Sequence, residues 1–175
     1  MTSRLMKSLL ISLAILSLVA GNGFTAPLQN QKAPDFTLED MQGNKVSLSD
    51  LKGKIVLINF WASWCAPCIL EMPDMQRLKE KLSGRPFTIL AVNVRESPGT
   101  IWKFLSRGKV DFTLLRDSEG VATRDWEVHG YPTSFLVDAR GEIRYIARGA
   151  RKWDTPDIVR IIEEMINEEN NSQGM

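Results

Sequence analysis

The sequence predicts an α/β domain with a mixed central sheet, helices on both faces, an N-terminal hairpin extension and a short central insertion. The apolar run 55–60 has the pattern of a central strand covered on both faces, and 87–94 is expected to be the next buried strand. Between them, apolar residues recur every three or four positions, as the buried face of a helix requires. A strand–helix–strand order implies parallel pairing, whereas the later run 134–148 is typical of an antiparallel hairpin.

The first residues precede this domain. Arg4 and Lys7 stand before a short apolar run, 9–20, and small residues follow it. This order is typical of a secretory signal, and the run is shorter than the roughly 20 residues that usually span a bilayer. We therefore expect residues 1–23 to be a signal peptide or an N-terminal membrane anchor, and the polar residues 24–32 to be a linker.

The domain itself is expected over residues 33–170, followed by a frayed tail at 171–175. It opens with a hairpin in which the apolar segments 36–38 and 46–48 pair across the turn residues between them. The strand 55–60 comes next and leads directly into the two cysteines of the chain.

A helix is expected from about Cys65 to Leu82. Its predicted buried stripe consists of Ile69, Met72, Met75, Leu78 and Leu82. Pro73 lies inside this helix and is expected to kink it, because the proline ring removes one bond of the ladder. Gly84 is expected to stop the helix before the strand 87–94.

The second half of the domain continues the alternation. A short helix over 101–105, ended by Gly108, precedes a strand over 110–115. The segments 134–137 and 142–148 then form the antiparallel hairpin. A final helix begins at Thr155 and Pro156, and its apolar stripe is Ile158, Ile161, Ile162, Met165 and Ile166.

The charge balance argues against nucleic acid as a partner. Lys and Arg number 22 and Asp and Glu 21, so the net charge of +1 creates no strong field. We expect a monomer that binds no nucleic acid. A basic stretch late in the chain is interpreted as a solvated face, with a docking patch for an acidic partner as the alternative; it consists of Arg140, Arg144, Arg148, Arg151 and Lys152.

Cys65 and Cys68 are the two cysteines of the chain, separated by Ala66 and Pro67. A disulfide across so short a loop constrains the unfolded state little, so a structural role is a weak interpretation. At the start of a helix, unpaired N–H groups and the helix dipole can lower the pKa of Cys65 from about 8.5 toward roughly 7. Cys65 is then expected to attack disulfides, and Cys68 to resolve the mixed disulfide.

The sequence argues against two other uses of a Cys-x-x-Cys pair, a zinc site and covalent haem attachment. A zinc site normally needs two more ligands, and the chain has no further cysteine and a single histidine, His129. Covalent c-type haem needs a histidine directly after the second cysteine, where this chain has Ile69. We therefore expect no metal and no cofactor at the pair.

The run 59–68, which reads NFWASWCAPC, resembles the active-site run of thioredoxins. With Glu71-Met72-Pro73 added, it resembles the exported TlpA/ResA/CcmG branch of that superfamily. Matches over roughly 33–167 support this, namely PDFTL at 34–38, Gly53-Lys54, and Gly130-Tyr131-Pro132-Thr133, which is similar to the loop whose proline is cis in the family. The resemblance implies a thioredoxin fold.

The resemblance also implies residue roles. Cys65 would attack and Cys68 would resolve, while Tyr131 and Pro132 would present backbone to a substrate polypeptide and Trp64 would shield the thiols beside it. Thioredoxins proper carry a buried Asp where this chain has Asn59, which cannot titrate. In the TlpA/ResA branch a glutamate three residues after the second cysteine takes a related role. Glu71 holds that position and would accept the Cys68 proton, with its pKa raised by burial; the alternative is a solvated glutamate.

The function implied is that of an extracytoplasmic thiol–disulfide oxidoreductase, exported to the periplasm or tethered to the inner membrane by its N-terminal segment. Strong oxidants of the superfamily have a histidine in the dipeptide and a large helical insertion, and both are missing here, which favours a reductant. Branch resemblance suggests apocytochrome c as the substrate and a membrane thiol transporter of the DsbD/CcdA type as the electron donor.

Two alternatives stay open. The segment 34–38 also resembles peroxiredoxins, whose sites need Pro and Thr or Ser seven and three residues before the cysteine; here these positions are Ile58 and Ala62. A copper-binding chaperone would use the two thiolates and His129, since soft sulfur suits Cu(I). The copper carriers of this fold, however, usually separate their cysteines by three residues.

Overall fold

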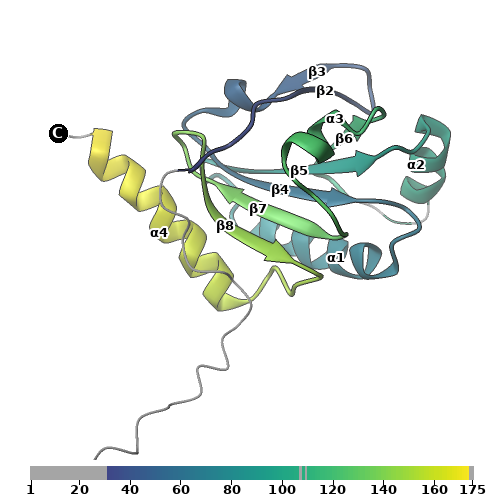
Figure 1. Ribbon diagram of the computed structural model, residues 1–175. Helices are drawn as coiled ribbons and strands as arrows, with labels where there is room; N and C mark the ends of the chain where they lie inside the picture. The colour runs from purple at the N-terminus through teal and green to yellow at the C-terminus, as the bar shows by residue number, and fades with distance from the viewer. Residues whose placement is uncertain (1–30, 107, 109, 174–175) are drawn as a thin grey trace, which may run out of the picture.

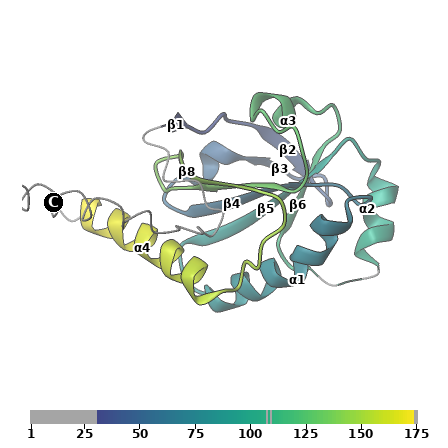
Figure 2. The same cartoon turned by 60° about the horizontal axis from the view of Figure 1, so that its bottom comes forward.

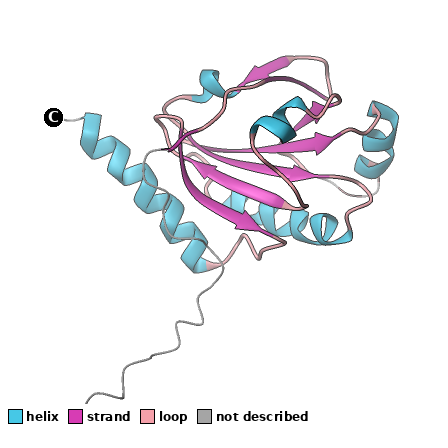
Figure 3. Cartoon of the chain, in the orientation of Figure 1, coloured by secondary structure: helices cyan, strands magenta, loops and turns pink. Residues whose placement is uncertain are grey.

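The computed structural model of the protein describes residues 31–106, 108 and 110–173. Figures 1 and 3 show a central sheet flanked by helices. Its elements are β1 Gln31–Lys32, β2 Thr37–Asp40, β3 Lys45–Ser47, the 3-10 helix η1 Leu48–Leu51, β4 Ile55–Trp61, α1 Ala66–Lys81, β5 Phe87–Val94, α2 Pro98–Leu105, β6 Thr113–Asp117, α3 Val121–Asp125, β7 Thr133–Val137, β8 Glu142–Arg148 and α4 Pro156–Gln173.

The strands of the described region form one mixed eight-stranded sheet in the order β1-β8-β7-β4-β5-β6-β2-β3. β4 pairs parallel with β5 and antiparallel with β7, and β5 pairs parallel with β6. The expected mixed sheet, the hairpin of β2 with β3 and the hairpin of β7 with β8 are therefore confirmed. The chain has the predicted α/β architecture.

Each face of β4 contributes to a separate core. Ile55 and Leu57 pack with residues of α1 and α4, whereas Val56 and Ile58 pack on the opposite side with Trp126. Figure 2 shows α1 and α4 below the sheet and α3 above it. Burial of each such aliphatic side chain stabilises the fold by about 1.5–3 kcal/mol, which explains why this strand is apolar apart from Asn59.

Helix α1 follows β4 after a short turn, so its N-terminus lies at the carboxyl end of the central strand. Cys65 is the N-cap residue in an extended conformation, and Pro67 lies in the first turn, where its missing N–H has no intrahelical partner to lose. Pro73 is accommodated inside the helix, and Gly84 follows its end with a φ of +78°. The expected helix is confirmed, and it places the cysteines at the edge of the sheet.

The predicted linker 24–32 is wrong at its last two residues. Gln31 and Lys32 form β1, which pairs antiparallel with Ile143 and Glu142 of β8. The edge of β8 offers free backbone groups there, and a polar segment can use them without burying side chains. The predicted signal or anchor, 1–23, and the remainder of the linker lie outside the described residues.

Two further boundaries differ from the prediction, and one helix was not predicted. α2 begins at Pro98, because Ser97 caps it by accepting a hydrogen bond from the Thr100 N–H at 3.2 Å. β6 covers 113–117 rather than 110–115, in register with the end of β5. The sequence analysis missed α3, whose first N–H groups are bound by the buried Asp117 carboxylate; the Thr123 N–H lies 2.8 Å from Asp117 Oδ2.

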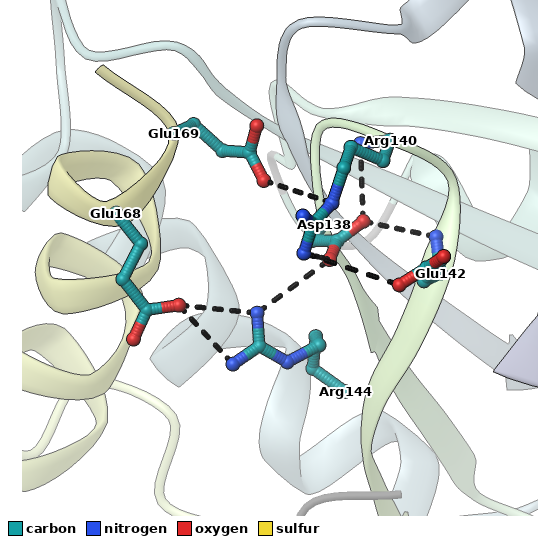
Figure 4. A network of polar contacts seen from close by, with 6 residues as sticks. All are labelled: Asp138, Arg140, Glu142, Arg144, Glu168 and Glu169. Atoms are coloured by element: carbon teal, nitrogen blue, oxygen red, sulfur yellow. Dashed lines mark hydrogen bonds and ion pairs between the residues drawn. The ribbon is translucent and has the colours of Figure 1, made fainter. Parts of the chain in front are cut away.

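Helix α4 continues to Gln173, so the tail predicted to fray from residue 171 is helical through 173. Figure 4 shows what holds its last turns: Arg144 bridges Asp138 and Glu168, and Arg140 contacts Asp138 and Glu169. These contacts connect the helix to β8 and to the turn before it. Within the described ranges, no helix combines the length and the apolar character needed to cross a bilayer.

Candidate active site

Cys65 and Cys68 form a disulfide at the N-terminus of α1, with an S–S distance of 2.08 Å. The Cys68 N–H donates to Cys65 Sγ at 3.3 Å, so a backbone donor faces this sulfur. Cys65 keeps 5% of its surface exposed, whereas Cys68 is fully buried. Of the two sulfurs, that of Cys65 is therefore the one open to a partner from solvent, and the roles of attacking and resolving thiol stay predictions.

An aromatic surface borders the pair. Trp64 is 69% exposed, and its ring meets that of Tyr131 edge-on at a centroid distance of 5.8 Å. The Tyr131–Pro132 peptide bond is cis, as the resemblance implied. The Gly149 N–H donates to the Pro132 carbonyl at 2.8 Å, and this bond fixes the loop. Trp64 and Tyr131 thus come together from separate loops, and substrate binding by Trp64, Tyr131 and Pro132 stays a prediction.

Glu71 is buried, with 2% of its surface exposed, so the alternative of a solvated glutamate is wrong. Its Oε1 accepts from Asn59 Nδ2 at 2.8 Å. Its Oε2 accepts from the Arg151 N–H at 2.9 Å and from Trp153 Nε1 at 3.0 Å. Glu71 and Cys68 lie three residues apart on the buried face of α1, where side chains at this spacing are neighbours.

Burial raises the pKa of the Glu71 carboxyl above its ordinary value. Hydrogen bonds from the Arg151 N–H, Trp153 and Asn59 favour the carboxylate and oppose this shift, and the nearby Asp74 adds to it. Desolvation is the largest of these effects, so the pKa is raised. A carboxylate with a raised pKa holds a transferred proton better than a solvent-exposed one does.

Sequence reasoning missed Glu96, which fixes the loop before the cysteines. Its carboxylate accepts from the Ser63 N–H at 2.7 Å and from Ser63 Oγ at 2.5 Å, and Asn93 Nδ2 donates to it at 2.7 Å. The signal was available, because the carboxyl ends of the parallel strands β4 and β5 meet at one edge of the sheet. No such sequence signal indicated that the Arg151 N–H and the Trp153 indole would donate hydrogen bonds to Glu71.

With this geometry established, comparison with known proteins identifies the family. Residues 29–146 match the AhpC/TSA family. The chain belongs to the AhpC/TSA family. It is 38% identical over 141 residues to the thiol-disulfide oxidoreductase ResA of Geobacillus kaustophilus, which covers 81% of this chain and 80% of that protein. Identity to ResA of Bacillus subtilis is 36% over 121 residues, 69% of this chain and 68% of that protein.

The fold of this AhpC/TSA family member is shared by solved structures. A Chlorobium tepidum protein described as the thiol:disulfide interchange protein DsbE superposes with a TM-score of 0.69 and 36% identity, covering 82% of this chain and 98% of that one. A Bacteroides thetaiotaomicron protein described as a disulfide isomerase gives a TM-score of 0.74 at 26% identity, covering 87% and 98%. The predicted thioredoxin fold and the predicted thiol–disulfide oxidoreductase are confirmed.

The site of this AhpC/TSA family member has no feature that favours a peroxiredoxin-like peroxidase or a copper-binding chaperone among the described residues. Ile58 and Ala62, where a peroxidatic site needs Pro and Thr or Ser, are apolar and fully buried. His129 is exposed and lies on the loop before Tyr131. In the part of the chain that the structure describes, no group of three His, Cys, Asp or Glu side chains is arranged to hold a metal ion.

Proposed function

We propose that this thiol–disulfide oxidoreductase reduces disulfides of protein substrates outside the cytoplasm. The observation that supports it best is the asymmetry of the pair, in which Cys65 keeps some exposed surface while Cys68 is fully buried, three residues before the buried Glu71 on α1. One thiol is placed for attack from outside. The burial of Cys68 supports a role in resolution, with Glu71 proposed as the acceptor of its proton.

The proposed cycle begins from the dithiol. The Cys65 thiolate attacks one sulfur of the substrate disulfide, so a mixed disulfide forms and the other substrate sulfur leaves as a thiolate. Cys68 then gives its proton to Glu71, and its thiolate attacks Cys65 Sγ. The Cys65–Cys68 disulfide forms, and the second substrate thiolate leaves. Two electrons have passed to the substrate, and protons from Glu71 and solvent neutralise its thiolates.

The direction follows from what stabilises the Cys65 thiolate. The helix N-terminus and the Cys68 N–H favour the anion, but the dipeptide Ala66-Pro67 adds no cation. A pair whose thiolate is only modestly stabilised has a low reduction potential and donates electrons. Return to the dithiol needs an external dithiol reductant.

The finer proposal concerns partners. Apocytochrome c is proposed as the substrate, and a membrane dithiol carrier of the DsbD/CcdA type is proposed as the electron donor. Similarity to proteins named ResA and DsbE supports this assignment. The basic and apolar pattern of residues 1–23 supports export, to the periplasm or to the outer face of the inner membrane.

Trapping tests the function directly. Reduced Cys68→Ser protein should accumulate a mixed disulfide with a disulfide-containing protein, because attack by Cys65 cannot be resolved. Cys65→Ser is the matched control and should trap nothing. Absence of adduct from Cys68→Ser, or equal adduct from both variants, would contradict the proposal. The apocytochrome assignment fails separately if deletion of the gene leaves c-type cytochrome levels intact.

A further inference from the structure

The basic stretch late in the chain divides into two parts in the structure. Arg140 and Arg144 are engaged with Asp138 and the last turns of α4, as Figure 4 shows. Arg148, at the end of β8, is exposed, and no carboxylate in the described part of the chain lies within ion-pair distance of it. Arg140 and Arg144 therefore stabilise the fold, whereas the Arg148 guanidinium is available to a partner.

Arg148 lies beside the loop that contains the cis-proline. In the register of β7 with β8 it is opposite Thr133, the residue after Pro132. Arg148 and Gly149 line a cavity of about 190 Å³ together with Tyr131, Pro132 and Thr133. The Arg148 side chain thus borders the loop that the proposed function places against a substrate polypeptide.

The lining of this cavity holds one arginine and one carboxylate. Glu127 is the acidic residue of the lining, and His129 faces the same space. Burial raises the pKa of the Tyr131 hydroxyl, Arg95 lowers it and Asp117 raises it, so a cation and a carboxylate both act on this side chain. Arg148 is therefore the group of this lining that can pair with a carboxylate of a partner.

We propose that Arg148 is a docking site for an acidic segment that flanks the disulfide of the substrate polypeptide. This inference rests on the proposed function, since the substrate must lie along the loop of Pro132. A carboxylate at the mouth of the cavity would meet Arg148, whose guanidinium can bind it through two parallel hydrogen bonds. Because the contact is exposed, it should affect the rate of encounter more than the chemistry and should weaken with salt.

Two disulfide peptides of identical length test the proposal. One carries Glu and the other Lys at the positions flanking its cysteines, and both are offered to the reduced full chain at low and at high salt. We expect the acidic peptide to be reduced about three-fold faster or more at low salt, with the preference shrinking at high salt. Arg148→Glu should remove or reverse the preference, and Arg148→Gln should reduce it.

Arg85→Glu is the matched control, because Arg85 is exposed and lies between α1 and β5, at the other end of the sheet from the cysteines. Arg85→Glu changes the net charge by the same amount as Arg148→Glu, and it should keep the preference for the acidic peptide. Equal rates for both peptides, or a preference that survives in Arg148→Glu, would overturn the docking site while leaving the exchange function standing. Failure to reduce either peptide would overturn the proposed function itself and the docking site with it.

Discussion

Asn59 Nδ2 donates a hydrogen bond to Glu71 Oε1 at 2.8 Å, and both residues are buried. The other oxygen, Oε2, accepts from two N–H groups, those of Arg151 and Trp153. An N–H group donates but cannot accept a hydrogen bond. A proton on Oε2 would therefore compete with two donated hydrogen bonds, whereas a proton on Oε1 would compete with only one. Glu71 therefore has one oxygen anchored by two donors and one better placed to take up a proton.

Replacing this carboxylate should slow the resolving step. Glu71→Gln keeps the size of the side chain but cannot take up the Cys68 proton, and loss of a general base costs about 10²-fold or more in rate. Rapid-mixing measurements of mixed-disulfide resolution between pH 5 and 9 should show a slower reaction with an altered pH profile. Glu80→Gln, on the exposed side of the same helix, is the control. An unchanged profile in Glu71→Gln would exclude the proton-transfer role.

The raised pKa of Glu71 also predicts how stability changes with pH. Above the ordinary value of 4.5 and below the raised pKa, the folded chain holds a proton that the unfolded chain has released. The free energy of unfolding must then fall as pH rises through this window. Urea titrations of the oxidised protein should show this fall, and Glu71→Gln should show a smaller one. Parallel curves for the two proteins would contradict the assigned direction.

Trp153 should influence Glu71 through its indole N–H. Trp153→Phe removes a donor to the carboxylate, so the pKa of Glu71 should rise further and the pH profile of resolution should shift upward. The lost hydrogen bond should cost about 1 kcal/mol of stability in addition to lost packing. Trp126→Phe is a matched control, because Trp126 is buried but its Nε1 has no partner in the described structure. Trp126→Phe should lose packing but leave the pH profile of resolution unchanged.

The Asp138 network in Figure 4 predicts a stability effect without a redox effect. The Asp138 carboxylate is fully buried, binds the Arg140 and Glu142 N–H groups, and faces two guanidiniums. Asp138→Ala should lower the free energy of unfolding by about 3 kcal/mol, because buried donors and charges lose their partner. Asp157→Ala, which removes an exposed pair with Arg160, should cost far less stability, because solvent screens that pair. Equal losses of unfolding free energy in Asp138→Ala and Asp157→Ala would show that burial of the carboxylate does not determine its contribution to stability.

The sequence predicted those parts of the fold that local patterns encode. The apolar run of β4, the stripe of α1 and the position of Cys65 at its start follow from periodicity and helix capping. By contrast, α3 depends on the buried Asp117 carboxylate, and β1 depends on the free edge of β8. Such elements are set by tertiary contacts, which a local pattern does not contain.

The same distinction applies to the site. The cysteine pair and the position of Glu71 could be predicted, because both lie within one motif. The environment of Glu71 could not, because its hydrogen-bond donors come from β4 and from the loop after β8, about 80 positions further along the chain. Burial of this glutamate is compensated by backbone and indole N–H groups, and a sequence pattern does not indicate a backbone donor.

The reduction potential of the Cys65–Cys68 pair tests the central claim most directly. It can be measured by equilibrating the purified chain with defined thiol–disulfide buffers and quantifying the dithiol. A reductant that depends on an external electron donor should have a potential near the roughly −270 mV of thioredoxin. A potential near the roughly −120 mV of strong oxidants would contradict the proposed direction and would mean that the pair introduces disulfides.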